Sequence, residues 1–231
     1  MVALRKRLAV VPARGGSKRL PRKNIKMIGG SPSIIHVLNT IAKTKLFDEI
    51  HVSTEDHEIS SLVSEFGYGP VFMRPNSLAE DDVPIADVLE FVTEEYAKIG
   101  FSFSTVAIIF PTALFLDAVE LEDAIKKFEL LPGEGREMLS VQRYPVPVEW
   151  SYQLNRNGEL IAKNPEKLKL QSQLLDDSFY ESGQFVLYDE VRIAIGKSEQ
   201  QYQKYGYELE SFAVDIDDER DWELAKRLFK Q

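Results

Sequence analysis

Cationic side chains and glycines are concentrated in residues 12–24, which read P-A-R-G-G-S-K-R-L-P-R-K-N. The segment follows an apolar run at residues 8–11, which predicts a short buried strand. Gly15 and Gly16 let the backbone approach a bulky anion, and the five arginines and lysines neutralise its charge. Ligands of open parallel sheets bind beyond the carboxyl ends of the strands, so the segment predicts a site for a phosphate-rich ligand.

The alternative for this basic segment is a solvated surface or a nucleic-acid patch, which is the usual explanation of a run of lysines and arginines. The preceding strand, the paired glycines and the flanking prolines favour phosphate binding instead. The segment has neither the G-x-x-x-x-G-K-[ST] spacing of a P-loop nor the G-x-G-x-x-G spacing of a dinucleotide site. The segment is therefore predicted to bind phosphate through a loop of a different kind.

A pair of carboxylates near the other end of the chain, Asp215 and Asp217, is the second candidate for chemistry. In an extended segment residues i and i+2 point to the same side, so both carboxylates can face one spot. Two such oxygen donors suit Mg²⁺, which is held by one or two carboxylates together with substrate phosphates. The alternative is a helix start with Asp217 or Asp218 as the N-cap. Both interpretations stay open, and the basic segment favours the metal site.

The remaining titratable residues give weaker signals. Asp87, at the start of a predicted helix, is a candidate for a metal or sugar contact, with a solvated helix residue as its alternative. His36, His51 and His57 lack the spacing of a metal cage. Surface or packing roles are expected for these histidines.

Composition limits the class of protein. The chain has 231 residues, 44% hydrophobic content and a net charge of −9, which argues against general binding to nucleic acid or to an anionic membrane. Cysteine is absent, so disulfides, thiolate catalysis and zinc–thiolate sites are excluded. No signal peptide and no apolar stretch of bilayer length is found, and we expect a cytoplasmic protein without nucleic-acid or membrane partners.

Strand and helix patterns alternate through the first part of the chain. Ser31 and Pro32 resemble an N-cap followed by a proline at the first helical position. This order predicts an α/β fold with a doubly wound, mostly parallel sheet. Strands are predicted at residues 8–11, 49–53, 71–73, 105–110 and 138–141, and helices at residues 32–41, 56–66, 85–99 and 119–128.

The pattern changes at residues 144–182, which predict an excursion out of the parallel sheet. Within it, strand-like residues flank Asn157-Gly158 and predict a β-hairpin. We expect residues 1–143 and 183–231 to form one α/β core, and residues 144–182 to form a small β-rich unit. The core is predicted to end with strands at residues 183–187 and 212–216 and a helix that begins near residue 218.

The order of these motifs resembles the acylneuraminate cytidylyltransferases, also called CMP-sialic acid synthetases. Residues 13–24 are similar to the signature A-R-x-G-S-K-x-x-P-x-K-N of that family, and residues 47–56 to F-D-x-I-x-V-S-T-D-D. The segment D-I-D-D-E-R-D-W at residues 215–222 completes the resemblance. The middle section resembles the pseudaminic acid cytidylyltransferase branch, with N-P-E at residues 164–166 and Y-E-S-G-Q-F at residues 180–185.

The resemblance implies a Rossmann-like nucleotidyltransferase fold and a reaction of CTP with a nine-carbon keto-acid sugar, which gives the CMP-sugar and pyrophosphate. Arg14 and Lys23 would hold the triphosphate and stabilise the leaving pyrophosphate, with Asp217 as a third catalytic residue. The middle section would build a homodimer. The implied nucleotide contacts are Ala13, Gly15, Ser17, Lys18, Asn24 and Arg74; the sugar contacts are Asp87, Thr112, Tyr180 and Gln184; and the Mg²⁺ ligands are Asp215 and Asp217.

Several positions depart from the family pattern. Phe110 replaces a glutamine of the sialic acid branch, and Gln171 and Leu174 replace the arginine and aspartate of R-S-Q-D-L. Alternatives therefore include a legionaminic acid or an eight-carbon Kdo substrate, or a nucleotide-sugar binding homologue with weak turnover.

Overall fold

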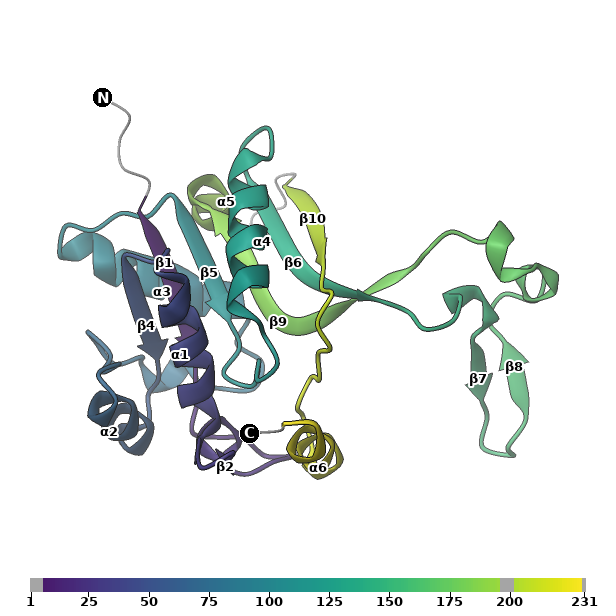
Figure 1. Cartoon of the computed structure of the whole chain (residues 1–231), viewed down its shortest axis with the longest axis horizontal. Coiled ribbons are helices and arrows are strands. Elements are labelled where there is room, and N and C mark those ends of the chain that lie inside the picture. Colours follow the sequence, from purple (N-terminus) through teal and green to yellow (C-terminus); the bar gives the residue numbers. More distant parts are fainter. Residues whose placement is uncertain (1–5, 196–201, 230–231) are drawn as a thin grey trace.

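The computed structural model describes residues 6–195 and 202–229. Its centre is a six-stranded sheet in the order β10-β6-β9-β5-β1-β4 (Figure 1). β1 is parallel to β4 and β5, β10 is parallel to β6, and only β9 runs antiparallel to both neighbours. The predicted α/β fold with a mostly parallel sheet is therefore confirmed. The strands are β1 Arg7–Pro12, β4 Glu49–Ser53, β5 Thr105–Ile109, β6 Arg136–Arg143, β9 Phe179–Asp189 and β10 Gln203–Glu208.

Alternation along the strands divides the core between the two faces of the sheet. In β1, Ala9 and Val11 pack with the apolar residues of α1, α2, α4 and α6, whereas Leu8 and Val10 pack with those of α3. Because successive side chains of a strand point to opposite faces, a fully apolar β1 requires helices on both. The helices are α1 Ser33–Thr44, α2 His57–Glu65, α3 Ile85–Lys98, α4 Ala118–Leu130, α5 Glu190–Ile195 and α6 Glu219–Leu228.

The start of α1 differs from its prediction. Ser31–Pro32 forms strand β3, which pairs with β2, Met27–Ile28, and the helix begins one residue later with Pro32 at the N-cap position. Gly29 and Gly30, with φ of +54° and +83°, turn the chain between the two strands. The serine backbone is therefore used in a hairpin rather than in a helix cap.

Two predicted strands are wrong, and β10 was not predicted. Residues 71–73 and 212–216 are irregular in the structure. The second of these segments is extended and buries Val214 and Ile216 against the core, which produces strand-like alternation without a neighbouring strand. The first packs its Phe72 ring on the ring of His51, with 4.4 Å between the ring centres, beyond the edge strand β4.

Residues 144–178, hereafter the arm, leave the sheet between β6 and β9 and extend away from the core (Figure 1). They contain the hairpin of β7, Tyr152–Leu154, and β8, Leu160–Ala162, and short 3₁₀ helices at Val148–Trp150, Lys167–Lys169 and Ser172–Leu174. Two further 3₁₀ helices, Lys23–Ile25 and Asn76–Leu78, lie outside the arm, in the α/β part of the chain. Within the described residues, no helix has the length and apolarity needed to cross a bilayer. Exposed apolar side chains of the arm are Tyr144, Val146, Val148, Tyr152, Leu154, Leu160, Ile161, Leu170 and Leu174.

Candidate active site

Two adjoining cavities lie at the carboxyl ends of β1 and β5. The first, of about 300 Å³, is lined by the basic segment of residues 12–24 and by the segment after α2. The second, of about 490 Å³, continues over β6 and β9. The residues common to both cavities are Lys23, Ile85, Phe110, Thr112 and Asp217.

The basic segment and the acidic pair converge at this junction. Lys23 Nζ donates to the Ile216 carbonyl at 3.0 Å and to Asp217 Oδ1 at 3.2 Å, and an Arg19 guanidinium nitrogen lies 2.7 Å from Asp217 Oδ2. The antiparallel β9 and the extended chain after β10 bring the C-terminal carboxylates back to the loop after β1. Both ends of the chain therefore contribute charge to a single cleft.

The pKa of Asp215 is shifted upward and the pKa of Asp217 is shifted downward. Burial and the neighbouring Asp217 raise the pKa of Asp215. Burial alone would also raise the pKa of Asp217, but its hydrogen bond to Lys23 and the charges of Lys23 and Arg19 lower the pKa below its usual value. Gly183, at φ +67°, lies directly against Asp215, because a Cβ on this glycine would be 3.1 Å from the Asp215 Cγ.

The alternative role in helix capping belongs to Asp218. Its carboxylate accepts hydrogen bonds from the Arg220 and Asp221 amides, and the Asp221 side chain completes a capping box. The carboxylates of Asp215 and Asp217 therefore remain available to the cleft. No cluster of three or more metal-binding side chains occurs among the described residues. Two carboxylates beside an anion-binding loop fit Mg²⁺, which completes its shell with water and phosphate oxygens.

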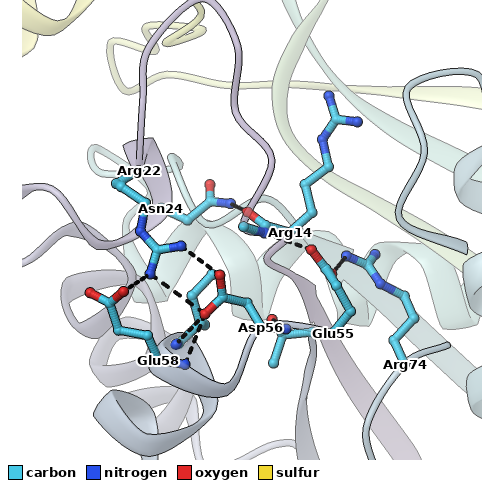
Figure 2. A network of polar contacts seen from close by, with 10 residues as sticks. Arg14, Arg22, Asn24, Glu55, Asp56, Glu58 and Arg74 are labelled. Atoms are coloured by element: carbon cyan, nitrogen blue, oxygen red, sulfur yellow. Dashed lines mark hydrogen bonds and ion pairs between the residues drawn. The ribbon is translucent and has the colours of Figure 1, made fainter. Parts of the chain in front are cut away.

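Glu55 connects the glycine turn to a buried arginine (Figure 2). Its Oε1 accepts from the Gly15 amide at 2.7 Å, and its Oε2 accepts from Arg74 Nη2 at 2.6 Å. The Arg74 side chain is 4% exposed and that of Glu55 is 13% exposed, so this is a desolvated ion pair. The bridge fixes the backbone of the basic loop relative to a cation in the wall of the first cavity.

The requirement for glycine at position 15 comes from Asp56. A Cβ on Gly15 would lie 2.1 Å from Asp56 Oδ2, which is inside van der Waals contact. Asp56 caps α2 and is held by Arg22, which also contacts Glu58 (Figure 2). Arg22 takes the left-handed conformation with φ of +56°. The hydrogen bond from Arg22 is the main cause that lowers the pKa of Asp56.

The exposed cations of the loop pair with carboxylates that a phosphate could replace. Arg14 Nη1 lies 2.7 Å from Asp81 Oδ1, and Lys18 contacts the other oxygen of the same carboxylate. These contacts, Lys18 first, lower the pKa of Asp81. Because exposed ion pairs contribute little stability, exchange of Asp81 for a polyphosphate has a small energetic cost.

Two nearly buried polar groups in the wall of the first cavity have unused hydrogen-bonding capacity. Asn24 Nδ2 donates to the Arg14 carbonyl at 2.9 Å, while its Oδ1 has no partner in the part of the chain that the structure describes. The Nε of Arg74 is also buried without a partner there. An acceptor and a donor of this kind suit the edge of a nucleobase.

The structure brings most of the predicted site residues to the two cavities, and others lie outside them. Ala13 and Gly15 lie in the backbone behind the loop, and Asp87 lies in the first turn of α3. Gln184 is buried in β9, where its amide donates to the Ser182 carbonyl, and Tyr180 donates to Gln142 Oε1 at the base of the arm. The predicted residues that line the cavities are Arg14, Ser17, Lys18, Lys23, Asn24, Arg74, Thr112, Asp215 and Asp217.

The sequence interpretation missed several residues of the cleft. Glu55 lies in the motif of residues 47–56 but was given no role, and Asp81 was given none either. An acidic residue directly after a strand that neighbours the basic loop was the available signal for Glu55. For Glu137 and Ser140 of β6, which line the second cavity, no signal existed without the register of the sheet.

A mostly parallel sheet with a cationic loop and a carboxylate pair at its carboxyl edge defines a nucleotidyltransferase. A family model described as cytidylyltransferase matches residues 8–123, and the chain belongs to this family.

Relatives with modest identity cover most of the chain. A pseudaminic acid cytidylyltransferase of Campylobacter jejuni is 28% identical over 180 residues, 78% of this chain and 77% of that protein. A CMP-N,N'-diacetyllegionaminic acid synthase of Legionella pneumophila is 26% identical over 227 residues, 96% of each. A solved CMP:2-keto-3-deoxy-manno-octonic acid synthetase with CTP has the same fold, with a TM-score of 0.74 and 16% identity over 96% of this chain and 98% of that one.

Proposed function

We propose that the protein transfers a cytidylyl group from CTP to the anomeric hydroxyl of a nonulosonic acid of the sialic or pseudaminic type. The products are the CMP-sugar and pyrophosphate. The observation that carries this proposal is the meeting of Lys23 with Asp217 at the junction of two cavities, one basic and one acidic. The names of the Campylobacter and Legionella relatives support the choice of acceptor.

The first cavity is proposed to bind CTP. Arg14, Lys18 and Lys23 exchange their carboxylate partners for phosphate oxygens, and Ser17 with the backbone at Ala13 and Gly15 shapes the loop. The free donor at Arg74 Nε and the free acceptor at Asn24 Oδ1 match the cytosine edge, which offers acceptors at N3 and O2 and a donor at N4.

Asp215 and Asp217 are proposed to hold Mg²⁺, whose chemistry would be to bridge phosphate oxygens and offset their charge. Lys23 leaves Asp217 when phosphate enters the cleft and then faces the triphosphate. Burial first, and then the charge of Asp217, raise the pKa of Asp215, and a cation held between the two carboxylates would offset both effects.

In the transfer itself, the anomeric hydroxyl releases its proton to solvent, and its oxygen forms a bond to the α-phosphorus as the bond from that phosphorus to pyrophosphate breaks. Arg14 and Lys23 stabilise the charge on the leaving group, and positioning supplies most of the rate. Thr112 lines both cavities and is proposed to orient the sugar at their junction. Gln184 acts indirectly, because its carbonyl accepts from the Phe110 amide in the cavity wall.

The arm is proposed to form a homodimer, because its exposed apolar side chains need a covering surface. We further propose that the enzyme works in the cytoplasm, where its nucleotide substrate is found. Both proposals are open to direct test by sedimentation of the purified chain and by localisation of a tagged copy.

The test of the activity is pyrophosphate release with Mg²⁺, CTP and a panel of nine- and eight-carbon keto-acid sugars. Release with one nine-carbon acid is the expected result and names the acceptor. Preference for an eight-carbon acid would assign a Kdo-type reaction. Binding of CTP without release from any acid would indicate a nucleotide-sugar binding homologue, in line with the replacements at Phe110 and Gln171.

A further inference from the structure

The second cavity extends well past the acidic pair. From Asp215 it continues along the α3 side of β6 and β9, over Leu139, Val186 and Tyr188. Its far end is formed by Glu137 at the start of β6 and by Lys204 on β10. None of the roles proposed above uses this far end.

Lys204 belongs to a small cluster of charged side chains with Glu137 and Arg192. The Glu137 side chain is 6% exposed, and its two oxygens contact Arg192 Nε at 3.0 Å and Lys204 Nζ at 3.3 Å. One carboxylate thus serves two cations. The Arg192 contact is desolvated and short, whereas the Lys204 side chain is 48% exposed toward the cavity region.

The ammonium group of Lys204 retains donors for a ligand. An ammonium has three N–H donors, and Glu137 takes one of them. Nζ also lies over the Tyr202 ring, 6.0 Å from its centre, and no further side-chain partner of Lys204 is found within residues 6–195 and 202–229. Glu137 therefore holds the ammonium group in place and leaves other N–H donors of that group available to a ligand.

The distance between the two ends of the cavity follows from the register. Gly183 lies against Asp215, and the neighbouring Ser182 donates to Ser140 Oγ, so Ser140 is near the level of the acidic pair; Glu137 precedes Ser140 by three residues in β6. At about 3.3 Å per residue, the far end is roughly 10 Å from the acidic pair. The cavity is therefore long enough for an extended acceptor.

Resting on the proposed function, which puts the anomeric carbon at the acidic pair, we infer that Lys204 binds carbonyl or hydroxyl oxygens at the far end of the acceptor. The acceptor's carboxylate is bonded to the anomeric carbon and stays at the reacting end, so the far end presents neutral oxygens. The anomeric carbon belongs to a ring, which spans about 2.5 Å from C2 to C6, and three further C–C bonds place the last carbon of a nine-carbon acid about 6 Å from the anomeric carbon. With a hydrogen bond of about 3 Å this spans the cavity, and an eight-carbon acid is one bond shorter.

The test compares the unaltered full chain with Lys204→Met, Lys204→Arg and Lys127→Met. Lys127 is the matched control, because it is an exposed lysine that contacts the next residues of β10 from the other face, with Nζ 5.1 Å from the centre of the Tyr207 ring. Pyrophosphate release is measured with CTP, Mg²⁺ and the nine-carbon acid that gives the highest rate.

Lys204→Met is expected to raise KM for the acid about tenfold, the loss typical of a hydrogen bond from a charged donor. The KM for CTP and kcat should stay within about twofold, because the hydrogen bond from Lys204 to the far end of the acid is equally strong in the ground state and in the transition state. Lys204→Arg should restore most of the affinity, and Lys127→Met should change nothing. The KM of an eight-carbon acid, or its inhibition constant where it is not turned over, should be the same with and without Lys204.

The outcomes separate the two proposals. If the unaltered chain releases no pyrophosphate with any keto acid, the proposed function fails and the inference with it. If the unaltered chain is active but Lys204→Met keeps its KM for the acid, the inference alone is overturned. A lower melting temperature with unchanged KM would assign the Glu137–Lys204 pair to strand pairing only, and equal rises of KM for both acids would place Lys204 away from the far end.

Discussion

Lys23 and Asp217, separated by 194 positions in the chain, lie in direct contact, with 3.2 Å between Nζ and Oδ1. Each of the two charges would otherwise be exposed to like charges, Lys23 to the arginines of its loop and Asp217 to Asp215. Their pairing neutralises both charges. The contact therefore connects the basic segment of residues 12–24 to the carboxylate pair.

Asp217→Asn is expected to lower kcat for pyrophosphate release by at least about 100-fold, because it removes a charged ligand from the proposed Mg²⁺ site, and that cation would offset the phosphate charge. The fold should persist, since α6 is capped by Asp218. The measurement is kcat together with the melting temperature.

Asp218→Ala is the control for this variant. Loss of the cap should destabilise the chain by about 1 kcal/mol and leave kcat unchanged. Equal activity of Asp217→Asn and the unaltered chain would remove Asp217 from the proposed metal site.

Glu55→Gln is expected to raise KM for CTP about tenfold with a smaller effect on kcat, because Arg74 loses its charged partner and the Gly15 amide is held less firmly. The matched control is Glu58→Gln, in the same network but with a side chain that is 70% exposed and, within the described part of the chain, forms an ion pair with Arg22 alone. Steady-state kinetics with varied CTP distinguish them, and similar KM values for both variants would contradict the role of Glu55.

Gly15→Ala and Gly16→Ala form a second matched pair. The first places a methyl group 2.1 Å from an Asp56 oxygen, whereas the second meets no atom within 4 Å. We expect Gly15→Ala to displace the loop and weaken CTP binding by at least tenfold, about 1.4 kcal/mol. Isothermal titration with CTP measures both, and unchanged binding by Gly15→Ala would show that the loop adapts at no cost.

Stability should depend on pH through His51. Burial lowers the pKa of His51 to about 4, so between about pH 6.5 and pH 4 the unfolded chain binds a proton that the folded chain does not. Its contribution is complete above about pH 6.5 and is lost as the pH falls, by up to about 3 kcal/mol near pH 4. Urea unfolding at pH 7.5 and pH 5 should show a smaller change for His51→Leu than for the unaltered chain.

The sequence was sufficient where local patterns determine structure. The alternating apolar segments predicted the α/β class, and the position of the basic run after β1 predicted its place beside a cavity at the carboxyl edge of the sheet. The order of the strands in the sheet could not be predicted from the sequence, because the antiparallel insertion of β9 between β5 and β6 depends on contacts between residues distant in sequence. For that reason the second cavity, with Glu137 and Lys204, could not be predicted, and Gln184 was expected in a pocket although its side chain is buried.

The arm is joined to the sheet at one rung of a ladder, since Arg143 of β6 and Phe179 of β9 are direct partners. Everything between these two residues is topologically a long hairpin loop, and a tight turn of roughly two to four residues could replace it without moving either strand. The sheet and the arm are thus joined at one defined place, and this is the splice point for a version of the chain with a shortened or exchanged arm.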